Sequence, residues 1–312
     1  MKTTLLVPIE LPPDHMARLT EHYDVIHVAE GADWLARTPD AGLQAEGLLT
    51  RGSIGLSASQ LVRLPRLRIV CCLGAGFENV DLEAMRKRSV VVTSGSGANR
   101  ACVADHAMGL VLAAMRGIAR FDRETRQGLW QANVGMPGQV SGKTLGILGL
   151  GSIGMELAHR AAAFSMPILY CNRQPRIDCD WTWVPDARTL ASRSDILVCL
   201  LPGGEQTRHL VNEQVLDALG PQGCFVNVSR GSVVETDALV RALQEGRIGC
   251  AGLDVYEDEP AVDSRLVELS NVVLTPHIAG RSAEARLQLL VTAIDSFRTF
   301  FGGGRLLNLA QA

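Results

Sequence analysis

The sequence predicts an α/β protein with two Rossmann-like, doubly wound parallel-sheet domains. Short apolar segments of strand length alternate with helical segments along the chain, which is the pattern of βα units in a parallel sheet. Residues 140–176 hold a strand, a glycine-rich turn, a helix and a second strand in one continuous run. The chain has 312 residues, which is enough for two domains of about 100–200 residues each.

The first parallel sheet is expected in the N-terminal third of the chain. A helix is predicted over residues 13–22, and strands are predicted at residues 3–8, 25–28, 47–50, 67–70 and 90–93. The turn after the fourth strand contains Leu73, Gly74, Ala75 and Gly76. Two glycines after a strand expose backbone N–H groups that could hold a substrate carboxylate, and a simple tight turn is the alternative.

An apolar helix is predicted over residues 101–120, where apolar residues recur at helical spacing. Asp105 and His106 lie near its start, and by position alone such residues cap or pack more often than they catalyse. Residues 121–142 contain Trp130 and are expected to form an irregular arm that reaches a partner subunit.

The glycine-rich turn is the most informative motif. Gly149, Gly151 and Gly154 form G-x-G-x-x-G between a predicted strand at residues 144–148 and a helical pattern. The first glycine permits a tight turn, the second lets the backbone approach a pyrophosphate, and the third lets the helix pack on the strand. The helix N-terminus offers N–H groups to phosphates. This context favours a dinucleotide site over a merely structural turn.

The end of the next strand indicates which dinucleotide is bound. An acidic residue there would accept hydrogen bonds from the ribose hydroxyls of NAD, but this sequence has Asn172. Arg173 and Arg176 follow, and a guanidinium can pair with a phosphate through two hydrogen bonds. The sequence therefore favours NADP, with NAD as the alternative. The arginines could instead be solvated loop charges, because Asp178 and Asp180 are close enough to compete for them.

Polar residues follow several strands in the second half of the chain. Strands are predicted at residues 167–171, 196–200, 224–228, 252–255 and 272–274, and helices at residues 213–219, 236–245 and 283–301. Arg230, Asp254 and His277 lie at strand ends, and Glu259 follows Asp254. Ligands bind at the carboxyl edge of open α/β sheets. These four residues are therefore candidates for one site, although each alone is more often a surface charge, a cap or a satisfied histidine.

Composition excludes several classes of protein. The net charge of −3 gives no general attraction to nucleic acid or to an anionic membrane. No segment approaches the roughly 20 apolar residues of a membrane span, and the N-terminal apolar run is too short for a signal peptide. The eight cysteines lack metal-ligand spacing. We therefore expect a cytoplasmic protein with reduced thiols, no disulfide and no metal.

Four segments occur in order: GLGSIG, NVSRGSVVETDALVRAL, GLDVYEDEP and LTPHIAG. They resemble the NAD(P)-dependent D-2-hydroxyacid dehydrogenase family. The resemblance implies a homodimer, a substrate domain of residues 1–100 and 282–312, and a dinucleotide-binding domain of residues 101–281 inserted into it. It implies that cofactor-binding residues, beyond the three glycines and the residues after the next strand, are Ser152, Ile153, Leu201, Pro202, Thr207, Val228, Ser229, Arg230, Asp254, His277, Ala279 and Gly280.

The same resemblance implies the reaction. His277 matches the family's acid/base, which protonates the keto oxygen as hydride arrives at carbon, a role that suits imidazole near neutral pH. Glu259 matches the carboxylate that pairs with this histidine, and Arg230 matches the residue that binds the 2-oxo acid. Asp254 matches a residue near the nicotinamide carboxamide. Residues 73–76 would add backbone donors for the substrate carboxylate.

The residues after the glycine-rich turn resemble those of NADP-preferring glyoxylate/hydroxypyruvate reductases. The predicted activity is thus reduction of glyoxylate and hydroxypyruvate to glycolate and D-glycerate. A second interpretation keeps this chemistry with NAD and another 2-oxo acid, phenylpyruvate-like or 3-phosphoglycerate-like. A third is a nucleotide-sensing corepressor of the same fold family, which the lack of a long disordered tail and of a basic patch disfavours.

Overall fold

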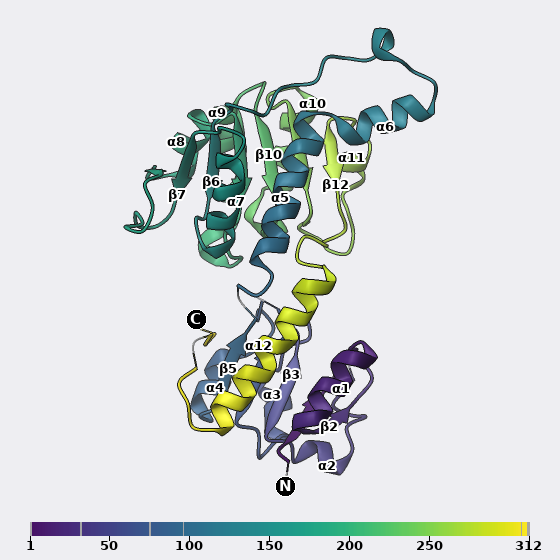
Figure 1. Ribbon diagram of the computed structural model, residues 1–312, viewed down its shortest axis with the longest axis vertical. Helices are drawn as coiled ribbons and strands as arrows, with labels where there is room; N and C mark the ends of the chain where they lie inside the picture. Colours follow the sequence, from purple (N-terminus) through teal and green to yellow (C-terminus); the bar gives the residue numbers. More distant parts are fainter. Residues whose placement is uncertain (1, 32, 75, 96, 307, 311–312) are drawn as a thin grey trace. The chain divides into compact units, whose positions relative to one another are not determined.

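The computed structural model describes residues 2–31, 33–74, 76–95, 97–306 and 308–310 (Figure 1). The chain divides into two compact units. We call Met1–Asn99 with Arg281–Ala312 the terminal unit, and Arg100–Gly280 the central unit. Each unit contains one parallel sheet with helices on both faces, so the predicted fold class is confirmed.

The terminal unit has a five-stranded sheet in the order β2-β1-β3-β4-β5, one of the common doubly wound orders. Its strands are β1 (Thr4–Val7), β2 (Asp24–His27), β3 (Gly47–Thr50), β4 (Ile69–Cys72) and β5 (Val91–Ser94). Its helices are α1 (Pro13–His22), α2 (Asp40–Leu43), α3 (Ala58–Val62), α4 (Leu82–Lys87) and α12 (Ala283–Phe301). Leu19 and Phe297 from α1 and α12 pack in one core, and Leu61 and Met85 from α3 and α4 pack in the other.

The central unit has a seven-stranded sheet in the order β12-β11-β10-β9-β6-β7-β8. Its strands are β6 (Leu145–Leu148), β7 (Ile168–Cys171), β8 (Thr182–Trp183), β9 (Ile196–Cys199), β10 (Cys224–Asn227), β11 (Cys250–Leu253) and β12 (Val272–Leu274). Its α-helices are α5 (Arg100–Met115), α6 (Ile118–Arg126), α7 (Ser152–Ala162), α8 (Ala187–Ser192), α9 (Glu213–Leu219), α10 (Thr236–Gln244) and α11 (Ser264–Val267). Helices α5 and α7 pack in one core, and α8, α9 and α10 pack in the other (Figure 1).

All strands of the central sheet except β8 end in register. Leu148, the last residue of β6, pairs with Cys171 of β7 and with Cys199 of β9. The last residues of β10, β11 and β12 continue the same alignment. Residues that follow these strands therefore leave the sheet at one edge. The chain order reverses between β6 and β9, and ligands of such sheets bind at this reversal.

The helix expected over residues 101–120 is in fact two helices. Gly117 adopts a left-handed φ of +60° between α5 and α6, and glycine takes this conformation without a steric penalty. The expectation of an irregular segment from residue 121 is wrong as far as Arg126, because these residues are helical. A 3₁₀ turn at Gln131–Asn133 follows in a segment that extends away from the sheet (Figure 1).

In the described part of the chain, no single helix is long and apolar enough to cross a membrane. Helices α5 and α6 together have the length and composition of a membrane-spanning segment, but they are bent by 57° relative to each other. Helix α5 buries residues such as Val103, Ala107 and Leu110 in the core against the sheet, whereas α6 buries none.

Candidate active site

The glycine-rich turn connects β6 to α7. Gly149 has a φ of +96°, and a side chain there would come within 3.0 Å of the Leu200 carbonyl, so glycine is required. A Cβ on Gly151 would meet nothing within 4 Å, whereas one on Gly154 would lie 2.8 Å from the Gly149 oxygen. Among the residues that the structure describes, no side chain caps the N-terminus of α7. Its first N–H groups and the open backbone at Gly151 therefore form a cradle that fits an anionic group such as a pyrophosphate.

Asn172, directly after β7, closes this turn. Its side-chain oxygen accepts a hydrogen bond from the Leu150 N–H at 2.7 Å, and its amide donates to the Leu150 carbonyl at 3.2 Å. The side chain thus holds the turn in shape. Because an amide is neutral, it adds no charge that would repel a phosphate at the end of β7.

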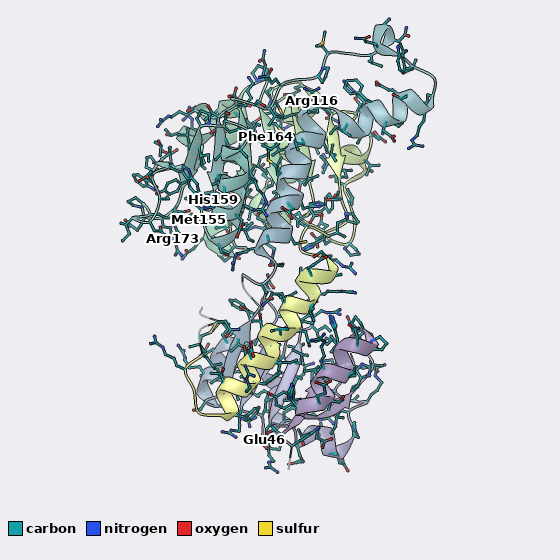
Figure 2. The ribbon with its side chains drawn as sticks, viewed as in Figure 1. Glu46, Arg116, Met155, His159, Phe164 and Arg173 are labelled. Atoms are coloured by element: carbon teal, nitrogen blue, oxygen red, sulfur yellow. The ribbon has the colours of Figure 1, made fainter. Side chains whose placement is uncertain are left out.

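The two arginines after β7 have different surroundings. Arg173 is exposed (Figure 2) and has no ion-pair partner among the residues that the structure describes. Arg176 donates from Nε to Asp178 Oδ1 at 2.8 Å, pairs through Nη2 with the other oxygen, and donates from Nη1 to the Leu150 carbonyl at 3.1 Å. The hydrogen bonds of this pair lower the pKa of Asp178 and raise that of Arg176. Asp178 therefore competes for one arginine but not for the other.

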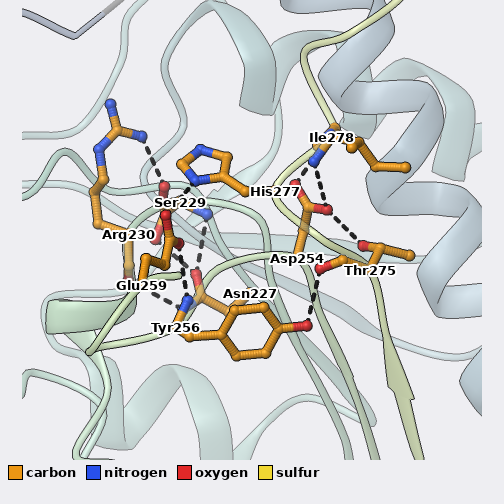
Figure 3. Close-up of polar contacts among 10 residues, drawn as sticks. Asn227, Ser229, Arg230, Asp254, Tyr256, Glu259, Thr275, His277 and Ile278 are labelled. Atoms are coloured by element: carbon orange, nitrogen blue, oxygen red, sulfur yellow. Dashed lines mark hydrogen bonds and ion pairs between the residues drawn. The ribbon is translucent and has the colours of Figure 1, made fainter. Parts of the chain in front are cut away.

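His277 and Glu259 come together from the loops after β12 and β11. Nδ1 of His277 lies 2.6 Å from Oε2 of Glu259 (Figure 3). The other carboxylate oxygen accepts a hydrogen bond from the Tyr256 N–H at 3.0 Å, which fixes the carboxylate. Since Nδ1 must donate to the carboxylate, Nε2 is the ring nitrogen that can exchange a proton with a ligand. The His277 side chain is half exposed, so a ligand can reach it.

Asp254 holds the backbone around His277. Its carboxylate, 1% exposed, accepts hydrogen bonds from the N–H groups of Ile278 at 3.0 Å and Ala279 at 2.8 Å, and from the Thr275 hydroxyl at 2.5 Å (Figure 3). His277 has a left-handed φ of +51°, and its own N–H bonds to the Asp254 carbonyl at 2.9 Å. Burial raises the pKa of Asp254, but the hydrogen bonds to its carboxylate outweigh burial and leave this pKa below its usual value.

Three residues near this loop were not singled out for a role by the sequence. Nε2 of His106, on α5, lies 2.9 Å from the Thr275 hydroxyl and 3.5 Å from the Asp254 carboxylate. The Tyr256 hydroxyl donates to the Thr275 carbonyl at 2.8 Å. The only sequence signal for Thr275 and Tyr256 is their position at strand ends, next to residues that were singled out. His106 was noted in the sequence only as a residue near the start of the apolar helix that more often caps or packs than catalyses.

Arg230 follows β10 and packs its loop against the loop that carries Glu259. Its Nη1 donates to the Ser229 carbonyl at 2.8 Å, and its own carbonyl accepts from the Asn227 amide at 3.1 Å. A Cβ on Gly231 would lie 1.9 Å from the carbonyl of Tyr256, so the two backbones touch here. The close-up of this region shows Arg230, Glu259 and His277 on adjacent loops (Figure 3).

Several other predicted cofactor-binding residues lie on loops at the carboxyl edge of the central sheet. The Thr207 hydroxyl donates to the Pro202 carbonyl at 2.7 Å, which closes the loop after β9. Three side chains are buried and could offer a ligand only their backbone: Val228 at 7% exposure, Ser229 at 6% and Ala279 at 4%. The remaining residues of this predicted set are Ser152, Ile153, Leu201 and Gly280, of which the first two begin α7.

The predicted substrate loop after β4 belongs to the terminal unit. The Leu73 N–H donates to the Thr50 carbonyl at 2.7 Å. Gly74 has a φ of +144°, and among the described residues nothing lies within 4 Å of a Cβ placed there, whereas one on Gly76 would lie 2.4 Å from the Glu78 carboxylate. Ala75 lies outside the described residues. The backbone at Gly74 is thus open to a small ligand.

Comparison with known proteins gives consistent results. Residues 108–279 match the family model described as D-isomer specific 2-hydroxyacid dehydrogenase, NAD binding domain. A glyoxylate/hydroxypyruvate reductase A of Arabidopsis thaliana is 41% identical over 82% of each chain. A hydroxyphenylpyruvate reductase of Plectranthus scutellarioides is 39% identical over 85% of this chain and 86% of its own. The crystal structure of the NADPH-dependent glyoxylate/hydroxypyruvate reductase of Sinorhizobium meliloti with NADP and malonate has a TM-score of 0.89 at 34% identity, covering 99% of this chain and 97% of that one.

Proposed function

Because the chain belongs to the D-isomer specific 2-hydroxyacid dehydrogenase family, we propose that it is an NADPH-dependent reductase of small 2-oxo acids, preferring glyoxylate and hydroxypyruvate. NAD is the alternative cofactor. The observation that carries the proposal is the contact of 2.6 Å between His277 and Glu259, on loops next to Arg230 at the edge of a doubly wound sheet. The names of the Arabidopsis and Sinorhizobium relatives support the substrates, and the NADP in the latter structure supports the cofactor.

The residues of the glycine-rich turn fit a dinucleotide, since Gly151 leaves open space and none of the described side chains caps α7. The N–H groups of Ser152 and Ile153 would hold the pyrophosphate. Arg173 would face the 2′-phosphate, because it is exposed at the end of β7 and is not already paired within the described chain. Bound NADPH supplies the hydride.

Proton transfer is assigned to His277. Its Nε2 gives a proton to the keto oxygen of the substrate, while Glu259 holds the ring through Nδ1 and stabilises the imidazolium in the reverse direction. Arg230 binds the substrate carboxylate and polarises the keto group as a permanently charged, forked donor. Asp254 keeps the backbone of Ile278 and Ala279 in place on the cofactor side. The backbone at Gly74 and Gly76 is proposed to bind the substrate carboxylate.

We assign residues 1–100 and 282–312 to substrate binding and residues 101–281 to dinucleotide binding. We also propose a cytoplasmic homodimer. The segment from α6 onward carries the exposed apolar side chains Ile118, Trp130 and Met136, which is the composition of a surface that a partner covers. All eight cysteines are free, which suits a reducing compartment. Light scattering that gives the mass of one chain would contradict the dimer.

The test is the initial rate of NADPH and NADH oxidation with glyoxylate, hydroxypyruvate, pyruvate and phenylpyruvate. We expect the highest kcat/KM with NADPH and either glyoxylate or hydroxypyruvate. Higher rates with phenylpyruvate would favour the second candidate, an aromatic 2-oxo acid reductase, which the similarity to hydroxyphenylpyruvate reductase supports. No turnover with any of these acids would refute the proposed function.

A further inference from the structure

We propose that Asp178 is a specificity-determining residue that weakens NADPH binding by occupying the guanidinium of Arg176. This inference rests on the proposed NADPH dependence and concerns how strongly this chain discriminates NADPH from NADH. Two arginines follow β7, but the structure makes them unequal. Arg173 is exposed without an ion pair in the described chain, whereas Arg176 already has an anionic partner.

The geometry of the pair explains why it would compete with a phosphate. Asp178 binds the edge of the guanidinium that carries Nε and Nη2, one of the edges that offers two parallel N–H groups to an oxyanion. Nη1 donates to the Leu150 carbonyl at 3.1 Å. At least three of the five N–H groups of Arg176 are therefore engaged within the protein. A 2′-phosphate could form two hydrogen bonds with this guanidinium only by displacing Asp178 or by binding to an edge with fewer available N–H groups.

Asp178 is not needed to keep Arg176 in place. The backbone N–H of Arg176 donates to the Tyr170 hydroxyl at 2.8 Å, and the bond from Nη1 to the Leu150 carbonyl ties the guanidinium to the glycine-rich turn. Trp183 also fixes this loop by donating to the Asn172 carbonyl at 3.1 Å. Removing the Asp178 charge should therefore free the guanidinium edge without moving the arginine away from the turn.

The negative charge of Asp178 should also weaken NADPH binding. A phosphate dianion near Arg176 would also lie near the carboxylate, and this repulsion is absent for the ribose hydroxyls of NADH. The side chains of Arg176 and Asp178 are 30% and 57% exposed, so water and salt screen the interaction. Two unit charges a few ångströms apart in water interact by an energy that corresponds to about a fivefold change in affinity. Asp178 should thus reduce NADPH affinity severalfold and leave NADH affinity almost unchanged.

The experiment measures dissociation constants by isothermal titration calorimetry for the full-length protein and its variants. The ligands are NADPH, NADH, adenosine 2′,5′-bisphosphate and 5′-AMP; the last two differ only in the 2′-phosphate. Asp178→Asn should tighten NADPH and the bisphosphate by about fivefold, and change NADH and 5′-AMP by less than about twofold. The gain should shrink at high ionic strength because salt screens exposed charges.

Two further variants make the test specific. Asp180→Asn removes the same charge from the same exposed loop, and Asp180 has no ion pair among the described residues, so it should leave all four affinities unchanged. In an Arg176→Gln background, Asp178→Asn should tighten NADPH less than it does in the wild type, because only the direct repulsion between Asp178 and the phosphate is then removed. An equal gain from Asp180→Asn, or no gain from Asp178→Asn, would overturn the proposal.

These outcomes are separable from failure of the proposed function. If the wild type binds NADH more tightly than NADPH or reduces no 2-oxo acid, the proposed NADPH-dependent activity fails. The ratio of bisphosphate affinities between Asp178→Asn and the wild type would still decide the role of Asp178, because this ratio requires no turnover.

Discussion

Two loops at the same edge of the central sheet each contain an aspartate, and the two carboxylates do different things. Asp254, after β11, is 1% exposed and binds two backbone N–H groups and a hydroxyl. Asp178, after β7, has a side chain 57% exposed and pairs with the side chain of Arg176. A buried carboxylate bonded to backbone fixes the conformation of a loop, whereas an exposed ion pair mainly balances charge. The loop that carries the proposed acid–base residue is therefore held rigidly, whereas the loop after β7 can change with little cost to the stability of the fold.

The largest expected effect is the loss of activity on substitution of His277, which lies on the loop held by Asp254. His277→Asn should lower kcat for glyoxylate reduction by about 10²–10⁴-fold, because the proposed general acid is lost. Asparagine tolerates the left-handed backbone at this position, where φ is +51°, so the loop should persist. Steady-state kinetics and circular dichroism check this together. The matched control is His22→Asn on the exposed end of α1, which should retain full activity; a similar loss in both variants would remove the basis for the assignment.

The second largest expected effect is a loss of stability on substitution of Asp254, whose carboxylate holds that loop. Asp254→Asn should reduce the free energy of unfolding by about 2–4 kcal/mol. The buried carboxylate now accepts hydrogen bonds from several donors, and the NH₂ group of an amide cannot accept them. Urea denaturation at neutral pH measures this. A change too small to detect would mean that the loop does not depend on the carboxylate.

The lowered pKa of Asp254 predicts how the stability difference between the wild type and Asp254→Asn depends on pH. A carboxyl whose pKa is lower in the folded state stabilises the protein fully above its unfolded pKa of about 3.9. This stabilisation is lost as the pH falls through the folded value. The difference in unfolding free energy between wild type and Asp254→Asn should therefore be constant near neutrality and decrease in acid. A difference that grew in acid would contradict the direction of the shift.

Most of the fold could be predicted because its elements carry local signals. Helix α12 was predicted with its observed bounds, Ala283–Phe301, since Ser282 caps an apolar periodic segment. The two-residue strand β8 was missed because its alternation is too short to detect. Helix α8 was also missed, although its N-cap residue Asp186 was a signal for it. The break at Gly117 was missed because a glycine within a helical pattern is often tolerated.

The site was predictable to the extent that strand ends could be found. Parallel strands that end in register bring their following residues to one edge, and this places Arg230, Asp254 and His277 near one another. The partners of Asp254 could not be predicted, because they depend on how the loop after β12 folds back over β11. The sequence left open whether the arginines after β7 are paired, since proximity in sequence does not say which side chains turn toward each other.

The smallest effect completes the comparison of the two aspartates. Asp178→Asn makes the same chemical change as Asp254→Asn, yet it should leave the Tm measured by scanning calorimetry unchanged at neutral pH. Within the described parts of the chain, its carboxylate bonds no backbone outside its own loop, and solvent can hydrate Arg176 when the pair is lost. If both substitutions lowered the Tm equally, the loop after β7 would be as much a part of the folded framework as the loop after β12. If only Asp254→Asn does so, the loop of the proposed acid–base residue is fixed, and the charge of the loop proposed to bind the cofactor can be altered independently of stability.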